Sequence, residues 1–69
     1  MKYAELTRKL RRLGCYFTRY GAGGHEIWRN PATGKQAPIP YHRTKEIGPN
    51  LLSRILHQLD VDRRDFDQV

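Results

Sequence analysis

Apolar residues recur at helical spacing near the start of the chain. One tyrosine and three leucines fall on one side of a helix with 3.6 residues per turn, which predicts an amphipathic helix over residues 3–13. The residues of this stripe are Tyr3, Leu6, Leu10 and Leu13. Gly14 follows the last leucine, at a position where helices commonly end in left-handed backbone.

A second apolar stripe lies in the last third of the chain. It follows Gly48 and Pro49, and proline favours the first position of a helix. The stripe consists of Leu51, Leu52, Ile55, Leu56 and Leu59. The remaining tail predicts one further helical turn, with Asp62 as its N-cap and Phe66 folded back onto the core.

Three short segments between the helices have strand character. Residues 15–20 are aromatic and β-branched, residues 25–30 alternate, and residues 36–40 form the third segment. Small residues predict turns at 21–24 and 31–35, and residues 41–48 form a connecting loop. Proline cannot donate to a strand ladder, so Pro38 and Pro40 place the third strand at a sheet edge.

The order of these elements defines the fold class. A helix, three antiparallel strands and a second helix predict an α+β domain, with both helices covering one face of a three-stranded sheet. Sixty-nine residues form a single domain over 1–69.

The charge is positive and unevenly distributed along the chain. Residues 1–58 carry eleven basic and three acidic side chains, whereas residues 59–69 carry two basic and four acidic ones. A basic body of this kind suits a polyanion such as RNA, DNA or an anionic membrane, and charge alone does not distinguish them. A basic surface that only confers solubility is the alternative.

The lone cysteine and the N-terminus predict where the protein works. Cys15 has no partner for an internal disulfide and lies in an apolar run, so it is expected to be a core residue in a reducing compartment. No segment has the length of a membrane span, and the first residues lack the apolar core of a signal peptide. We therefore expect a cytoplasmic protein.

Several kinds of chemistry find no support in the residue pattern. The histidines lack cysteine partners and ligand spacing, so no metal or other cofactor is expected. The glycine-rich turn is not followed by the Lys and Ser or Thr of a phosphate-binding loop. Glu26 and Glu46 are isolated among basic residues, which favours salt bridges over acid/base roles.

The three histidines remain as proton-transfer groups. His25 follows the glycine turn, where little side-chain bulk blocks a phosphate and turn amides are exposed, yet an ordinary surface histidine fits equally well. His42 and Arg43 follow the third strand and are suited to a phosphate, or are simply loop residues. His57 lies opposite the leucine stripe and is expected to be solvated.

Two aromatic residues in the strands have several possible roles. Tyr16 and Trp28 suit base stacking if they lie on the open side of the sheet. Contact with a protein partner, or cover for the edge of a thin core, are the alternatives.

Four strings, in this order and spacing, resemble the HicA family of mRNA interferase toxins. They are KLRRLGC at 9–15, GGHEIWRNP at 23–31, IPYHR at 39–43 and IGPNLLSRILHQL at 47–59. The resemblance implies a fold similar to the double-stranded-RNA-binding domain. It also implies metal-independent endoribonuclease action on mRNA, a catalytic histidine at His25, and a HicB-type antitoxin that covers this histidine.

The chain departs from the family pattern around His25. Gly24 stands where the family usually has serine, so only a backbone amide remains there to contact phosphate. The turn before His25 is one residue longer than in relatives. Glu26 replaces a basic residue or histidine and is expected to be a carboxylate neighbour that raises the pKa of His25.

The leading hypothesis is a ribonuclease in which His25 is the general acid/base. The residues expected to bind RNA are Gly24, Arg8, Arg11, Arg12, Arg19, His42 and Arg43. A non-catalytic RNA-binding module of the same fold is the alternative. A small protein-interaction domain with an acidic partner is the third hypothesis.

Overall fold

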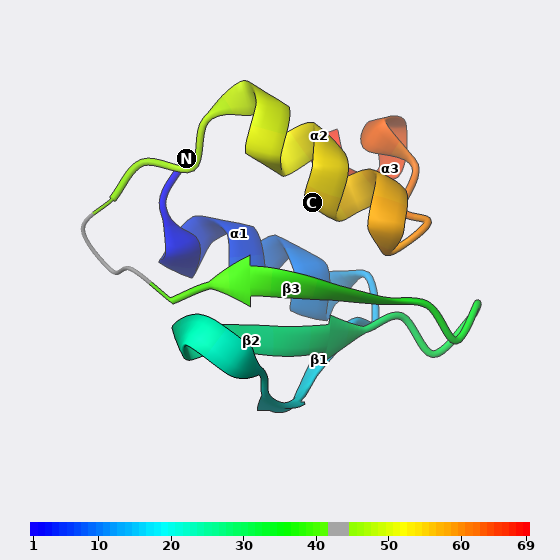
Figure 1. The fold of residues 1–69 in the computed structure, drawn as a ribbon. Helices are drawn as coiled ribbons and strands as arrows, with labels where there is room; N and C mark the ends of the chain where they lie inside the picture. The colour runs from blue at the N-terminus through cyan, green and yellow to red at the C-terminus, as the bar shows by residue number, and fades with distance from the viewer. Residues whose placement is uncertain (42–44) are drawn as a thin grey trace.

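The computed structural model describes residues 1–41 and 45–69 of the chain. The elements follow one another as α1 (Tyr3–Arg12), β1 (Tyr16–Tyr20), the short 3₁₀ turn η1 (Ala22–Gly24), β2 (His25–Arg29), β3 (Gln36–Pro40), α2 (Pro49–Gln58) and α3 (Arg63–Asp67) (Figure 1). The predicted order of helices and strands is confirmed. His42 and Arg43, two of the predicted RNA-binding residues, lie outside the described residues.

The strands form one antiparallel sheet in the order β1-β2-β3. In β2, His25 pairs with Pro40 of β3 and Glu26 pairs with Ile39. A bulge interrupts β1, because Phe17 pairs with Trp28 and Arg19 pairs with Ile27, which leaves Thr18 as an extra residue. The edge position predicted for the third strand is confirmed, since β3 pairs only with β2 among the described strands.

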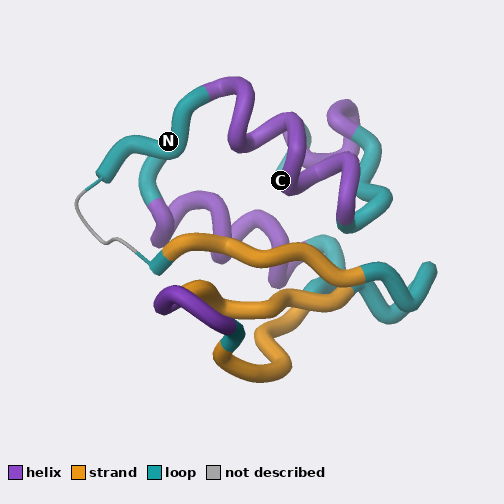
Figure 2. Tube along the Cα trace, viewed as in Figure 1, coloured by secondary structure: helices purple, strands orange, loops and turns teal. Residues whose placement is uncertain are grey.

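The helices lie together on one face of the sheet, so the molecule has two layers (Figures 1 and 2). The core between the layers contains Trp28 of β2, Phe66 of α3 and the leucines of both long helices. Cys15 is buried in this core as predicted, and burial raises the pKa of its thiol. This is the two-layer α+β fold of the double-stranded-RNA-binding type.

The helix ends follow the predicted signals. Gly14 has a φ of 93°, in the left-handed region that glycine adopts without steric cost. Pro49 begins α2 after the extended Gly48. Asp62 caps α3 by accepting a hydrogen bond of 2.7 Å from the backbone N–H of Arg64.

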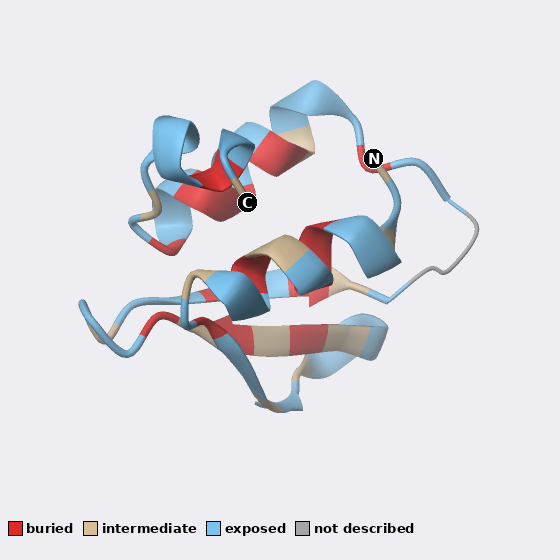
Figure 3. Ribbon diagram, turned by 180° about the vertical axis from the view of Figure 1, so that it is seen from behind, coloured by how far each residue is buried: buried red, intermediate tan, exposed pale blue. Residues whose placement is uncertain are grey.

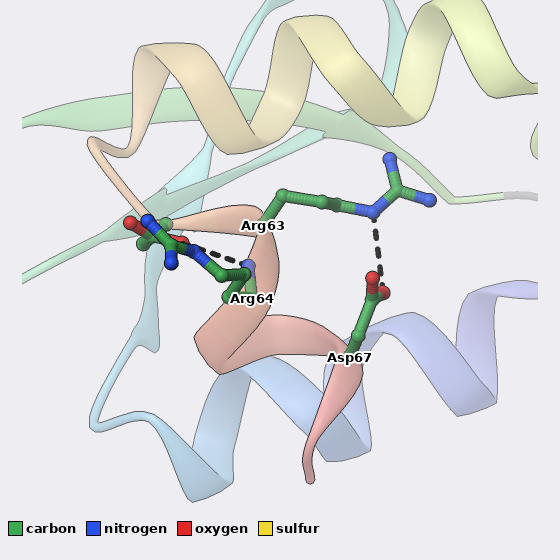
Figure 4. Close-up of polar contacts among 4 residues, drawn as sticks. Arg63, Arg64 and Asp67 are labelled. Atoms are coloured by element: carbon green, nitrogen blue, oxygen red, sulfur yellow. Dashed lines mark hydrogen bonds and ion pairs between the residues drawn. The ribbon is translucent and has the colours of Figure 1, made fainter.

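The short α3 carries its own ion pairs at the surface. Arg63 donates to Asp67 one turn later at 3.2 Å, and Arg64 lies 3.9 Å from Asp62 (Figure 4). Phe66 on the inner side of this helix is fully buried. The tail is therefore an ordered part of the domain, in agreement with the predicted turn.

The N-terminus is joined to the segment that precedes α2. The amino group of Met1 forms an ion pair with the Glu46 carboxylate, and this hydrogen bond lowers the pKa of Glu46. The backbone N–H of Ile47 donates to the Met1 carbonyl at 2.7 Å. The salt bridge predicted for Glu46 is thus confirmed, with the chain terminus as its partner.

None of the described helices has the length and hydropathy needed to cross a bilayer.

Candidate active site

The side chains of β2 alternate between the core and the open face of the sheet. Glu26 and Trp28 are buried, as is Asn30 directly after the strand, whereas His25, Ile27 and Arg29 are half-buried on the other face. Bands of buried and intermediate residues alternate along the strand in Figure 3. The strand therefore supplies structural groups to one side and candidate functional groups to the other.

The base-stacking role considered for Trp28 is wrong. Its ring is fully buried, and its indole N–H donates to the Glu26 carboxylate at 3.0 Å. The guanidinium of Arg11 lies 5.1 Å from the centre of the ring and covers it from α1. Of the alternatives for this residue, cover and filling of the thin core is the one that the structure supports.

The surface salt bridge predicted for Glu26 is also wrong. Its carboxylate is buried and accepts hydrogen bonds from the Tyr3 hydroxyl and the Trp28 indole. Burial, together with the Glu26 carboxylate, raises the pKa of Tyr3 above its usual range. Because Glu26 faces the core, it is not the carboxylate neighbour that we expected beside His25.

Asn30, which the sequence did not single out, is a structural residue at the end of β2. Its side-chain amide donates to the Leu59 carbonyl at 2.8 Å, and its side-chain oxygen accepts from the backbone N–H of Ala32 at 3.1 Å. These bonds join the strand to the end of α2 and shape the turn that follows.

A hydrogen bond orients the His25 ring. Nδ1 lies 3.1 Å from the carbonyl oxygen of Ala22. A carbonyl oxygen only accepts hydrogen bonds, so this contact requires the proton on Nδ1. In neutral His25, the free lone pair is then on Nε2, which is the nitrogen able to take up a proton.

The glycine turn shapes the backbone in front of His25. The N–H of Gly21 donates to the His25 carbonyl at 2.8 Å, and a Cβ at Gly21 would lie only 2.9 Å from Cδ1 of Ile27. Gly24 has a φ of 76°, which disfavours other residues on backbone grounds. Glycine therefore suits this position of the turn better than serine does, because it adopts left-handed backbone without steric cost.

His25 lines a surface cleft between β3 and α2. The cleft has a volume of about 250 Å³. Its lining residues are His25, Pro38, Pro40, Leu51, Arg54, Ile55 and Gln58. His25 therefore lies beside an open cleft at the edge of the sheet, and the described residues that line this cleft include one arginine and no carboxylate.

Two further arginines lie on the open face of the sheet. Arg19 donates to the Gln36 side chain at 3.0 Å, and Arg29 donates to the Gly34 carbonyl at 3.3 Å. The ion pairs found in the described part of the chain involve neither of them. Their charges are available to an anion. Arg19 lies on the same face of the sheet as His25.

The other predicted contact residues lie apart from His25. Arg8 and Arg12 are exposed on α1, which covers the opposite face of the sheet, and Arg11 is held over Trp28. Tyr16 is exposed and pairs with Arg29 on the open face, so it keeps the position that base stacking requires. His57 is exposed on α2, as predicted.

Arg54 and Gln58 are the cleft residues that the sequence analysis missed. Both lie on α2 between positions of its apolar stripe, where polar residues are expected to be solvated. The available signal was their spacing, because Leu51, Arg54, Ile55 and Gln58 fall on one side of a helix. Only the packing of α2 beside β3 shows that this side meets His25.

In the described part of the chain, no group of three His, Cys, Asp or Glu side chains is arranged to hold a metal ion.

The fold and the site together define a small basic domain of the double-stranded-RNA-binding type with an accessible histidine in a carboxylate-free cleft. Comparison with known families then gives its membership. The sequence model of the family described as HicA toxin of bacterial toxin-antitoxin matches residues 3–61, and the chain belongs to this family. It is thus a toxin of a toxin–antitoxin system, with an antitoxin as its partner. No curated protein and no solved structure matches the chain.

Proposed function

We propose that the protein is a metal-independent endoribonuclease that cleaves mRNA with His25 as its acid/base residue. The observation that carries the proposal is the state of His25. His25 lines an open cleft and its Nδ1 donates to the Ala22 carbonyl, which supports a role for Nε2 in proton transfer. Membership of a toxin family supports the same conclusion, because cleavage of mRNA stops growth.

The chemistry requires only groups that this surface and the RNA supply. Nε2 of His25 takes the proton of a ribose 2′-hydroxyl, and the 2′-oxygen attacks the adjacent phosphorus. The bond between phosphorus and the 5′-oxygen breaks, and the leaving oxygen takes a proton from water at the open surface. The products are a 2′,3′-cyclic phosphate and a 5′-hydroxyl end.

Several cationic groups support binding of the RNA backbone. Arg19 on the open face and the backbone amide of Gly24 lie on the His25 side of the sheet, where we propose that they contact the phosphates near the cleaved bond. The exposed arginines of α1 would contact RNA farther from this bond, across the helical face. This second set consists of Arg8, Arg11 and Arg12. His42 and Arg43 complete the proposed set.

We further propose that the antitoxin is of the HicB type and silences the protein by covering His25. A cleft that opens at the sheet edge is easily blocked by a bound protein segment. A chain this short has few residues with which to cover the cleft itself.

The direct test is cleavage of an mRNA fragment by the purified chain in buffer with EDTA. We expect fragments that end in a 2′,3′-cyclic phosphate, and no cleavage of the same sequence with 2′-O-methyl riboses. Tight binding of the unmodified RNA without any product would overturn the nuclease proposal and favour the non-catalytic RNA-binding module. Cleavage that requires a divalent metal would overturn the proposed mechanism.

A further inference from the structure

The side of α2 that faces the cleft carries one cation. Leu51, Arg54, Ile55 and Gln58 lie at successive turns of the helix and line the cleft opposite the prolines of β3. We propose that this cleft binds the phosphodiester group that is cleaved, and that Arg54 is the residue that neutralises its charge. This inference rests on the proposed ribonuclease function and adds a second functional residue to His25.

The position of Arg54 is fixed by its buried neighbours. Ile55 is almost fully buried, and α2 packs directly against β3. Leu51, one turn before Ile55, is half-buried against the core. The helix therefore cannot rotate freely, and it presents Arg54 beside the cleft while the charged end of the side chain stays exposed to solvent.

The composition of the cleft favours an anion. Pro38 and Pro40 have no backbone N–H, so the edge of β3 supplies no amide donor at these two positions. The side-chain donors are then the guanidinium of Arg54 and the amide of Gln58, while neutral His25 keeps a lone pair on Nε2. None of the ion pairs within residues 1–41 and 45–69 uses Arg54.

The size of the cleft fits one unit of an RNA backbone. Its volume of about 250 Å³ lies just below the range of pockets for drug-sized ligands, about 300–1,000 Å³. A guanidinium binds two phosphate oxygens at once through parallel N–H groups. Such a pair strengthens as the non-bridging oxygens of the attacked phosphate gain negative charge. A histidine occupied with proton transfer does not provide this stabilisation.

The test compares Arg54→Gln with Arg54→Lys and with the matched control Arg64→Gln on α3. Arg64 is also an exposed arginine, but it lies beside Asp62 and does not line the cleft. We expect the single-turnover rate at saturating RNA to fall by about 10- to 100-fold in Arg54→Gln and to recover in part in Arg54→Lys. Arg64→Gln should stay within about twofold of the unmodified protein, and all variants should keep its thermal unfolding midpoint.

The outcomes separate this inference from the proposed function. If the unmodified protein cleaves RNA and Arg54→Gln cleaves it equally fast, the role of Arg54 is refuted and the ribonuclease function stands. If the unmodified protein does not cleave, the function fails, and the same variants are compared for binding of the 2′-O-methyl RNA. A selective loss of affinity in Arg54→Gln, about fivefold or more beyond Arg64→Gln, then supports the phosphate site, and equal affinities refute it.

Discussion

The two faces of β2 differ in how their polar groups are used. On the face toward the helices, Glu26, Trp28 and Asn30 are buried and hydrogen-bonded to one another or to neighbouring elements. On the open face, His25 and Arg29 are half-buried, and the polar contact of each side chain in the described part of the chain is with a backbone carbonyl of a nearby turn. The six consecutive positions 25–30 thus divide into a set that holds the fold and a set that we propose for binding.

Polarity by itself does not identify a functional residue in a domain this small. The carboxylate of Glu26 is a buried charged group on β2, yet it already accepts hydrogen bonds from Tyr3 and Trp28. The His25 ring is held by the contact of Nδ1 with the Ala22 carbonyl, and we propose that a substrate contacts its Nε2. The predictions below test this division of β2 into two faces.

The largest expected effect is on the buried face. Trp28→Ala removes the largest fully buried side chain and should cost about 3–5 kcal/mol of unfolding free energy. A domain of this length has roughly 3–10 kcal/mol in total, so we expect the variant to be unfolded or nearly so. Ile27→Ala on the open face is the matched control and should cost about 1 kcal/mol. Urea unfolding followed by circular dichroism measures both, and equal losses would contradict the assignment of the two faces.

A smaller effect is expected from Tyr3, the partner of Glu26, at high pH. Burial and the carboxylate raise the pKa of Tyr3, so the folded state keeps a proton that the unfolded chain releases near pH 10. The unfolded state then binds fewer protons, and stability falls as the pH rises above 10. Urea unfolding at pH 8 to 11 should show a smaller decrease in Tyr3→Phe than in the unmodified protein.

The control for this measurement is Tyr20→Phe, because Tyr20 is 74% exposed. It should retain the full decrease in stability above pH 10. An identical pH dependence in Tyr3→Phe and Tyr20→Phe would show that the contact between Tyr3 and Glu26 does not bear on stability.

The smallest effect is expected from Arg29 on the open face. Arg29→Gln gives up one hydrogen bond to the Gly34 carbonyl and should change stability by less than about 0.5 kcal/mol. It should weaken RNA binding a few-fold and reduce the salt dependence of the binding constant by about one phosphate contact. Fluorescence anisotropy at several salt concentrations measures this, and a salt dependence equal to that of the unmodified protein would place Arg29 outside the RNA-binding surface.

Most of the fold was predictable because it rests on local signals. The apolar stripes, the left-handed Gly14, Pro49 at the start of α2 and the Asp62 cap are each determined within a few residues. The position of β3 at the sheet edge followed from its prolines, since a missing N–H has the same consequence in any tertiary structure.

The site was predictable only in part, because its composition depends on packing. Alternation along residues 25–30 placed His25 and Glu26 on opposite faces, but it did not say which face the helices cover. A polar residue at position 26 and an aromatic residue at position 28 fit either face of the sheet. Their burial depends on the Tyr3 hydroxyl of α1, which donates a hydrogen bond to the Glu26 carboxylate. Arg54 was missed because its meeting with His25 depends on how α2 packs beside β3.

The role of His25 as the acid/base residue is tested by comparing RNA cleavage by His25→Ala with cleavage by His57→Ala. His57 is an exposed histidine on α2 that lies outside the cleft, so it controls for the loss of an imidazole. We predict that His25→Ala lowers the single-turnover rate of RNA cleavage at least about 100-fold, while its melting temperature stays within about 4 °C of the unmodified protein. His57→Ala should cleave at the unmodified rate. A folded His25→Ala protein that cleaves RNA as fast as His57→Ala would contradict the account.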